Sequence, residues 1–162
     1  NLRAGEKAFS LATFLISATY LKAGIDMLCE GHWEKHYDLS FNLYSLYAEA
    51  EYCNGHFQEV GHATGIVIKR AKSFENKLRV YATLIKSLAA QNLLQDAMTI
   101  GFGVLTRLGV SCTSSPPEES VIMNDIMEMK MILIKTTDVE LLNFQEMKDD
   151  NTITAVFAAG RR

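Results

Sequence analysis

The sequence predicts an all-α fold in which antiparallel helical hairpins stack one after another along the chain. Apolar residues recur three and four positions apart in almost every window, as on one face of an α-helix, and no window alternates with the period of two that a strand requires. The breaks between these windows are short, and such connections force neighbouring helices to run antiparallel. The two prolines stand together at Pro116-Pro117, so long stretches contain no helix breaker.

The first three predicted helices cover residues 9–28, 37–52 and 60–71. The apolar stripe of the first consists of Phe9, Ala12, Leu15, Ile16, Thr19, Tyr20, Ala23 and Met27. After the second helix, Asn54 and Gly55 can take the left-handed conformation that ends a helix. A hairpin is therefore expected here.

In this hairpin, Ala48, Ala50 and Tyr52 are expected to pack the first helix. Gly55 is expected to turn the chain, and the return helix is expected to begin with Phe57 and Val60.

Two further helices are predicted at 78–94 and 94–108. Ser73 is a suitable N-cap for the first of them, because a serine hydroxyl can accept a bond from a free backbone N–H. Gln91-Asn92 is expected to end that helix and Gly109 to end the next.

A loop is expected at 111–120, followed by a helix at about 117–135. Ser115 is its predicted cap, with Pro116 or Pro117 in its first turn. Asp138 is the predicted cap of a short last helix. The methionines of the 117–135 helix are expected to fill a core face: Met123, Met127, Met129 and Met131.

Length and composition suit one soluble globular domain spanning residues 1–162. The net charge of −3 argues against a phosphate-binding surface for nucleic acid, and no apolar stretch reaches the length of a membrane span. Cys29, Cys53 and Cys112 are far apart and odd in number, which fits buried thiols in a reducing, cytoplasmic setting. Because the chain begins with Asn1 rather than Met, we expect it to be a fragment of a longer protein.

The signatures of nucleotide chemistry are absent from the sequence. It contains no GxxxxGK[ST] phosphate loop and no HRD or DFG kinase motif. Gly101-x-Gly103 lies within a helical stripe rather than after a strand, so it does not indicate dinucleotide binding. No catalytic residue and no cofactor can be assigned.

One cluster leaves an enzyme or a metal site open as an alternative. His32 and His36 are four residues apart near a helix start, with Cys29 three residues before His32 and Glu34 between the two histidines. This is half of a metal-site pattern, without the second half that HExxH or a CxxC pair would supply. Histidines flanking the entry of a helix are the other interpretation.

The hairpin pattern resembles tetratricopeptide repeats, which place small residues where two helices touch and Gly or Asn at the turn. The segment 55–60 aligns with 92–97, about 36–40 residues later. The resemblance implies an α-solenoid. The residues expected to form its turns and helix contacts are Trp33, Ala48, Gly55, Phe57, Ala97 and Gly109.

The order of several landmarks resembles the helical-repeat region of a family of large signalling proteins. These landmarks are Asn1-Leu2, Ala4-Gly5, Tyr20-Leu21 with Gly24, Trp33-Glu34 with Tyr37, and Leu108-Gly109-Val110. Proteins of this family combine a serine/threonine-kinase-like domain, an AAA-type predicted ATPase, the repeat, a GAF domain and often a histidine kinase. His56 and Val60 depart from the family pattern, as does the end of the chain, where a continuing helix is expected.

The resemblance implies a non-catalytic scaffold that binds neighbouring domains of its parent or peptide segments. The residues expected to line the concave, partner-binding face are Tyr44, Tyr47, Glu51, Arg79 and Lys86. A small helical enzyme or metal-binding domain, and a module that forms homo-oligomers, are the alternatives.

Overall fold

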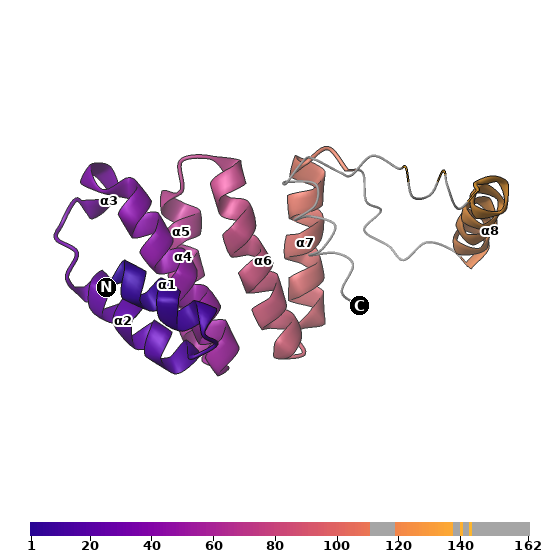
Figure 1. Cartoon of the computed structure of the whole chain (residues 1–162). Coiled ribbons are helices and arrows are strands. Elements are labelled where there is room, and N and C mark those ends of the chain that lie inside the picture. Colours follow the sequence, from indigo (N-terminus) through magenta and orange to yellow (C-terminus); the bar gives the residue numbers. More distant parts are fainter. Residues whose placement is uncertain (111–118, 138–139, 141–142, 144–162) are drawn as a thin grey trace.

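The computed structural model describes residues 1–110, 119–137, 140 and 143. Within these ranges the regular structure is entirely helical, which confirms the all-α prediction (Figure 1). The helices are α1 (Leu2–Ser10), α2 (Phe14–Asp26), α3 (His32–Lys35), α4 (Tyr37–Asn54), α5 (Phe57–Arg70), α6 (Phe74–Ala90), α7 (Leu94–Arg107) and α8 (Glu119–Lys135).

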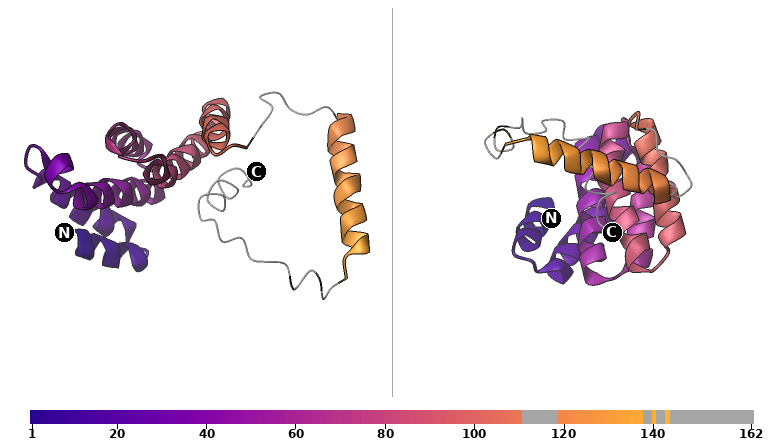
Figure 2. Two further views of the ribbon diagram at one scale, coloured as in Figure 1. Left: turned by 90° about the horizontal axis from the view of Figure 1, so that it is seen from above. Right: turned by 90° about the vertical axis from the view of Figure 1, so that its right-hand side faces the viewer.

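Helices α1 to α7 form a row in which each helix packs on its neighbours. The main contacts join α1 to α2, α2 to α4, α4 to α5, α5 to α6 and α6 to α7, while the short α3 lies against α4. Figures 1 and 2 show this row, with α8 standing apart beyond α7. The core has two parts: one joins α2, α4 and α5 around Leu21 and Leu43, and the other joins α3, α5 and α6 around Trp33, Val67 and Val80.

Three turns of the same kind reverse the chain and define three hairpins, α1–α2, α4–α5 and α6–α7. Each contains one residue with positive φ: Ala12 (55°), Gly55 (79°) and Asn92 (61°). The N–H of the next residue then donates to the carbonyl five positions back, in the pairs Thr13–Ala8 (3.0 Å), His56–Glu51 (2.9 Å) and Leu93–Leu88 (2.9 Å). These bonds satisfy carbonyls that the ending helix leaves free, as in a Schellman cap.

The prediction of one helix over 9–28 is wrong, because the chain turns at Ala12 between α1 and α2. The Thr13 hydroxyl stabilises this turn by donating to the Ala8 carbonyl at 2.8 Å. The expected core stripe is also wrong for α2. Its large apolar residues Leu15, Ile16 and Tyr20 are exposed, whereas the buried face consists of Ser17, Ala18, Leu21 and Gly24.

Small residues on this buried face allow α2 to approach its neighbours closely. The Ser17 hydroxyl donates to the Gly5 carbonyl at 2.8 Å. A Cβ on Gly5 would lie 2.5 Å from Leu21 Cγ, and one on Gly24 would lie 2.9 Å from Leu43 Cδ2. Two glycines among the sequence landmarks, Gly5 and Gly24, therefore mark the contacts of α2 with α1 and α4.

The connection between α5 and α6 is held by Tyr37 at the start of α4. Its hydroxyl accepts bonds from the Lys72 N–H (2.9 Å) and from Asn76 Nδ2 (3.0 Å), and Lys72 Nζ lies 4.3 Å from the centre of its ring. Ser73 caps α6 as predicted, accepting from the Asn76 N–H at 3.3 Å. One tyrosine thus links the start of α4 to the connection between α5 and α6 and to the first turn of α6.

Other predictions about buried residues are not met. Met123, Met127, Met129 and Met131 are exposed on α8 rather than packed in a core. Cys29 and Cys53 are exposed rather than buried. The predicted caps Ser115 and Asp138, both prolines and Cys112 lie outside the described residues, as does the loop at 111–120 except its last two positions, which belong to α8.

We expect Gly5→Ala to lower the free energy of unfolding by about 1–3 kcal/mol, because the added methyl overlaps Leu21. Gly61→Ala is the matched control. It also changes a helical glycine, but a Cβ there meets no atom within 4 Å, so helix propensity should raise stability by up to about 1 kcal/mol. Urea denaturation of both variants measures the difference. Equal effects would contradict the close contact of α1 with α2.

Candidate protein-interaction groove

A groove of about 530 Å³ lies between the facing sides of α4 and α6. It exists because these two helices are the first helices of consecutive hairpins and run next to each other. Its lining residues are Phe9, Glu49, Tyr52, Cys53, Glu75, Leu78, Arg79, Ala82, Thr83 and Lys86.

Charged groups of both signs surround the apolar part of the groove. Arg79 joins its two walls through a paired contact with Glu49, in which Nε donates to Oε1 at 2.6 Å and Nη2 donates to Oε2 at 3.0 Å. These bonds raise the pKa of the Arg79 guanidinium, so it stays charged. Lys86 forms no ion pair with any residue that the structure describes, and its ammonium is free to meet a ligand.

The five residues predicted to bind a partner fall into two groups. Arg79 and Lys86 line the groove. Tyr44 is half-buried against the ring of Trp33, with the two ring centres 5.6 Å apart, and lies outside the groove. Tyr47 and Glu51 are buried, so the expectation that they form part of an accessible surface is wrong.

The sequence reading missed Glu49, Tyr52 and Cys53 on the α4 wall. Tyr52 and Cys53 lie three and four positions after Glu49 and therefore on the same side of the helix as Glu49. Ala48 and Ala50 are buried and mark the sides of α4 that pack on other helices. These two alanines could therefore have identified the side with Glu49, Tyr52 and Cys53 as the unpacked one.

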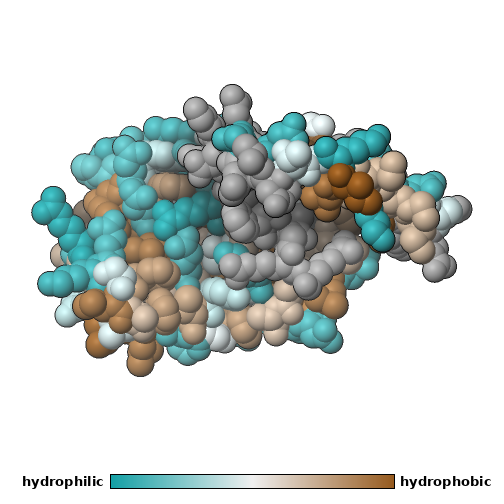
Figure 3. Space-filling model, turned by 45° about the vertical axis from the view of Figure 1, so that its right-hand side comes forward, coloured by the Kyte–Doolittle hydropathy of each residue, from teal (hydrophilic) through white to brown (hydrophobic). Residues whose placement is uncertain are grey.

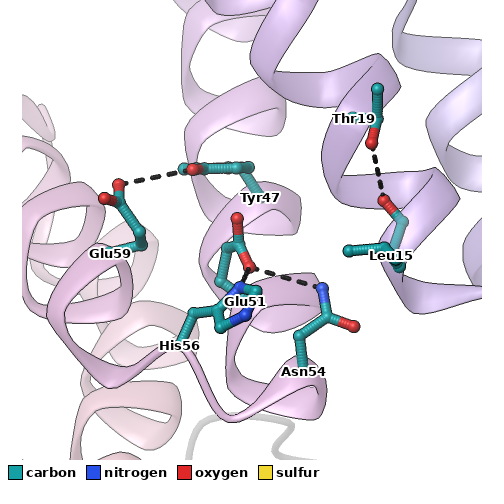
Figure 4. Close-up of polar contacts among 7 residues, drawn as sticks. All are labelled: Leu15, Thr19, Tyr47, Glu51, Asn54, His56 and Glu59. Atoms are coloured by element: carbon teal, nitrogen blue, oxygen red, sulfur yellow. Dashed lines mark hydrogen bonds and ion pairs between the residues drawn. The ribbon is translucent and has the colours of Figure 1, made fainter.

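Tyr47 and Glu51 instead belong to a polar cluster between α4 and α5 (Figure 4). Glu51 Oε2 lies 2.6 Å from His56 Nδ1 and accepts a bond from Asn54 Nδ2 at 3.3 Å, which holds the turn between the two helices. The Tyr47 hydroxyl donates to Glu59 Oε2 at 3.3 Å. Burial, followed by the nearby carboxylates of Glu51 and Glu59, raises the pKa of Tyr47.

The residues predicted to form turns and helix contacts occupy the following positions. Trp33, Ala48 and Ala97 are buried, and Phe57 is half-buried at the start of α5. Gly55 and Gly109 both have positive φ, at 79° and 80°.

The cluster considered for an enzyme or metal site lies around α3. Cys29, His32 and Glu34 border a pocket of about 310 Å³ together with Arg70, whose Nη1 is 3.7 Å from Glu34 Oε1. His36 is not among the residues that line it.

The imidazole of His32 is already engaged, since its Nδ1 lies 2.8 Å from the Ser40 hydroxyl. In the described part of the chain, no three His, Cys, Asp or Glu side chains are grouped closely enough to hold a metal ion. No helix among the described residues is long and apolar enough to cross a membrane.

Tyr47→Phe is expected to reduce the loss of stability at alkaline pH. The pKa of the Tyr47 hydroxyl is higher in the folded chain than in the unfolded chain, so as the pH rises the unfolded chain loses the hydroxyl proton first. The stability linked to it is therefore complete below about pH 10, the ordinary pKa, and falls as the pH rises further. One such group contributes a slope of at most about 1.4 kcal/mol per pH unit.

Urea denaturation between pH 9 and about 11.5 measures this slope. Tyr20→Phe, at an exposed tyrosine of α2, is the control. An unchanged slope in Tyr47→Phe would contradict the proposed burial of this hydroxyl.

Comparison with known proteins gives one informative similarity. No family model matches the chain, and no solved structure matches it. The chain is 27% identical over 119 residues to hybrid signal transduction histidine kinase G of Dictyostelium discoideum. The match covers 68% of this chain but only 4% of that protein's length. This similarity agrees with the expected relation to large multidomain signalling proteins.

Proposed function

We propose that residues 1–162 form a non-catalytic, tetratricopeptide-like scaffold domain within a cytoplasmic multidomain signalling protein. The observation that carries the proposal is the row of three hairpins with the same turn, arranged so that α4 and α6 face a common groove. Helical repeats of this kind bind peptides or neighbouring domains on such surfaces. The similarity to a segment of a signalling kinase supports the multidomain setting.

The groove suits a protein segment that carries both apolar and acidic side chains. Leu78, Ala82 and the ring of Tyr52 supply apolar contact area, and Lys86 supplies an unpaired positive charge. Arg79 is held in place by Glu49, so a partner would meet a preformed surface rather than order it on binding. The domains expected next to the repeat in the parent, above all the predicted ATPase module, are the proposed partners. In this proposal nucleotide binding and phosphoryl transfer belong to those domains.

Self-association is a second candidate, favoured by the outer face of α2. Leu15, Ile16 and Tyr20 are exposed there, beside Leu11 and Met27 near the two ends of the helix. Figure 3 shows that apolar side chains reach the surface in patches between polar ones. Sedimentation at several concentrations separates a monomeric scaffold from a homo-oligomer.

Binding of the purified chain to the isolated ATPase module of its parent tests the groove. We expect Lys86→Glu to weaken this binding at least tenfold, because it reverses the free charge of the groove. Lys69→Glu is the matched control, since Lys69 is exposed on α5 and does not line the groove. Titration calorimetry gives both affinities. Absence of binding by the unmodified chain, or equal weakening by the two variants, would contradict the proposal.

A further inference from the structure

The next long helix of the chain packs on α2 and on α5, but no helix packs on the corresponding side of α7 in the described structure. Counting from the left-handed turn residue of each hairpin, Leu21, Thr64 and Gly101 occupy the same position of the second helix. Leu21 and Thr64 are completely buried, whereas Gly101 is half-buried. Near Gly101, Leu94 and Met98 are 55% and 41% exposed.

The residues thirteen positions after each left-handed turn residue show which helix covers α2 and α5. These residues are Ile25, Ile68 and Leu105. Ile25 of α2 packs on the core that contains Leu43 of the next helix, α4. Ile68 of α5 packs on the core that contains Val80 of the next helix, α6. Leu105 is the equivalent residue of α7, and the described structure packs no following helix against it. In the first two hairpins the next long helix of the chain therefore supplies the cover.

The apolar residues of α8 include a set with the same spacing as buried residues of α4 and α6, the helices that cover α2 and α5. The buried residues of α4 include Leu43, Leu46 and Ala50, and those of α6 include Val80, Thr83 and Ser87. Both sets are spaced i, i+3 and i+7. On α8, Ile126, Met129 and Leu133 have the same spacing, are exposed and line one apolar hollow with Asp125 and Lys130.

The connection from α7 to α8 is long enough for this placement. It covers 108–118, close in length to the segment 27–36 that carries the chain from α2 to α4. An extended chain spans about 3.3 Å per residue, while packed helices lie only about 8–10 Å apart. A tether this short also gives α8 a high effective concentration at α7 of its own chain, which favours it over a second copy.

The charges agree with an antiparallel pair. α7 has Asp96 in its first turn and Arg107 in its last. α8 has Asp125 in its first half and Lys135 in its last turn. When the helices run antiparallel with Ile126 beside Leu105, Asp125 comes near Arg107 and Lys135 comes near Asp96, and opposite charges attract.

We propose that α8 docks on α7 of the same chain, with Ile126, Met129 and Leu133 against Leu94, Met98 and Leu105. α8 would then pack on the second helix of the α6–α7 hairpin, just as α6 packs on the second helix of the α4–α5 hairpin. In the present structure α8 lies apart (Figure 2), so the proposal adds a docked state of this helix. It does not depend on the groove between α4 and α6 having a partner.

Hydrogen exchange of the amides of 121–135 in the full chain tests the docking. We expect exchange at least tenfold slower than in a peptide of residues 119–137, and fast exchange in the Met98→Glu variant. Leu39→Glu is the first control, because Leu39 is 42% exposed, close to the 41% of Met98, but lies on α4. Met129→Glu should also abolish the protection, whereas Met131→Glu, on the opposite side of α8, should not.

Protection of α4 amides in every variant shows that the hairpins remain folded. Peptide-like exchange of α8 in the unmodified chain would overturn the proposal, as would protection that Met98→Glu leaves intact. Protection that disappears on dilution, together with a dimer in sedimentation, would assign the contact to a second copy and overturn docking within one chain.

Discussion

The fold depends on the left-handed residue in the turn of each of the three hairpins, α1–α2, α4–α5 and α6–α7. A residue with positive φ ends a helix within one position and returns the chain alongside it, and the N–H bonds that follow satisfy the last carbonyls. Because the turn is the same at Ala12, Gly55 and Asn92, the second helix of each hairpin leaves in the same relative direction. Equivalent faces then meet from one hairpin to the next, which gives the row of helices and the groove along α4 and α6.

Small side chains allow the helices of the row to approach one another closely around the larger apolar residues of the core. Gly5, Ser17 and Gly24 bring α1, α2 and α4 together, and Ala48 and Ala50 are buried on α4. Large apolar residues are exposed on α2, α7 and α8. The same packing that makes the hairpins compact therefore leaves surfaces that other helices or partners can cover.

The sequence predicted the turns where residue type carries the information. Gly55 and Asn92 belong to the residue types that take positive φ most readily, and Ser73 is a typical helix cap. Ala12 carries no such signal, because alanine favours the interior of a helix, and this led to one predicted helix where there are two. The α2 core face was missed for a related reason, since its buried positions hold serine and glycine while larger residues suggested the opposite side.

The candidate site could be predicted only in part. Arg79 and Lys86 were found because they lie on the first helix of a hairpin, but Tyr47 and Glu51 on α4 face α5 instead of solvent. Which side of α4 is covered depends on both neighbouring helices, and helical spacing alone does not supply that information.

The substitution Ala12→Gly tests most directly the claim that left-handed turns define the hairpins. A left-handed turn and a continuous helix at this residue predict changes of opposite sign in the free energy of unfolding. In the left-handed turn, alanine carries a steric cost that glycine lacks, so the variant should raise the free energy of unfolding by about 1 kcal/mol. In one continuous helix over 9–28, the same change would lower it by about 1 kcal/mol through lost helix propensity. Urea denaturation of the full chain gives the sign. A decrease would contradict the α1–α2 hairpin and the regular row of turns built on it.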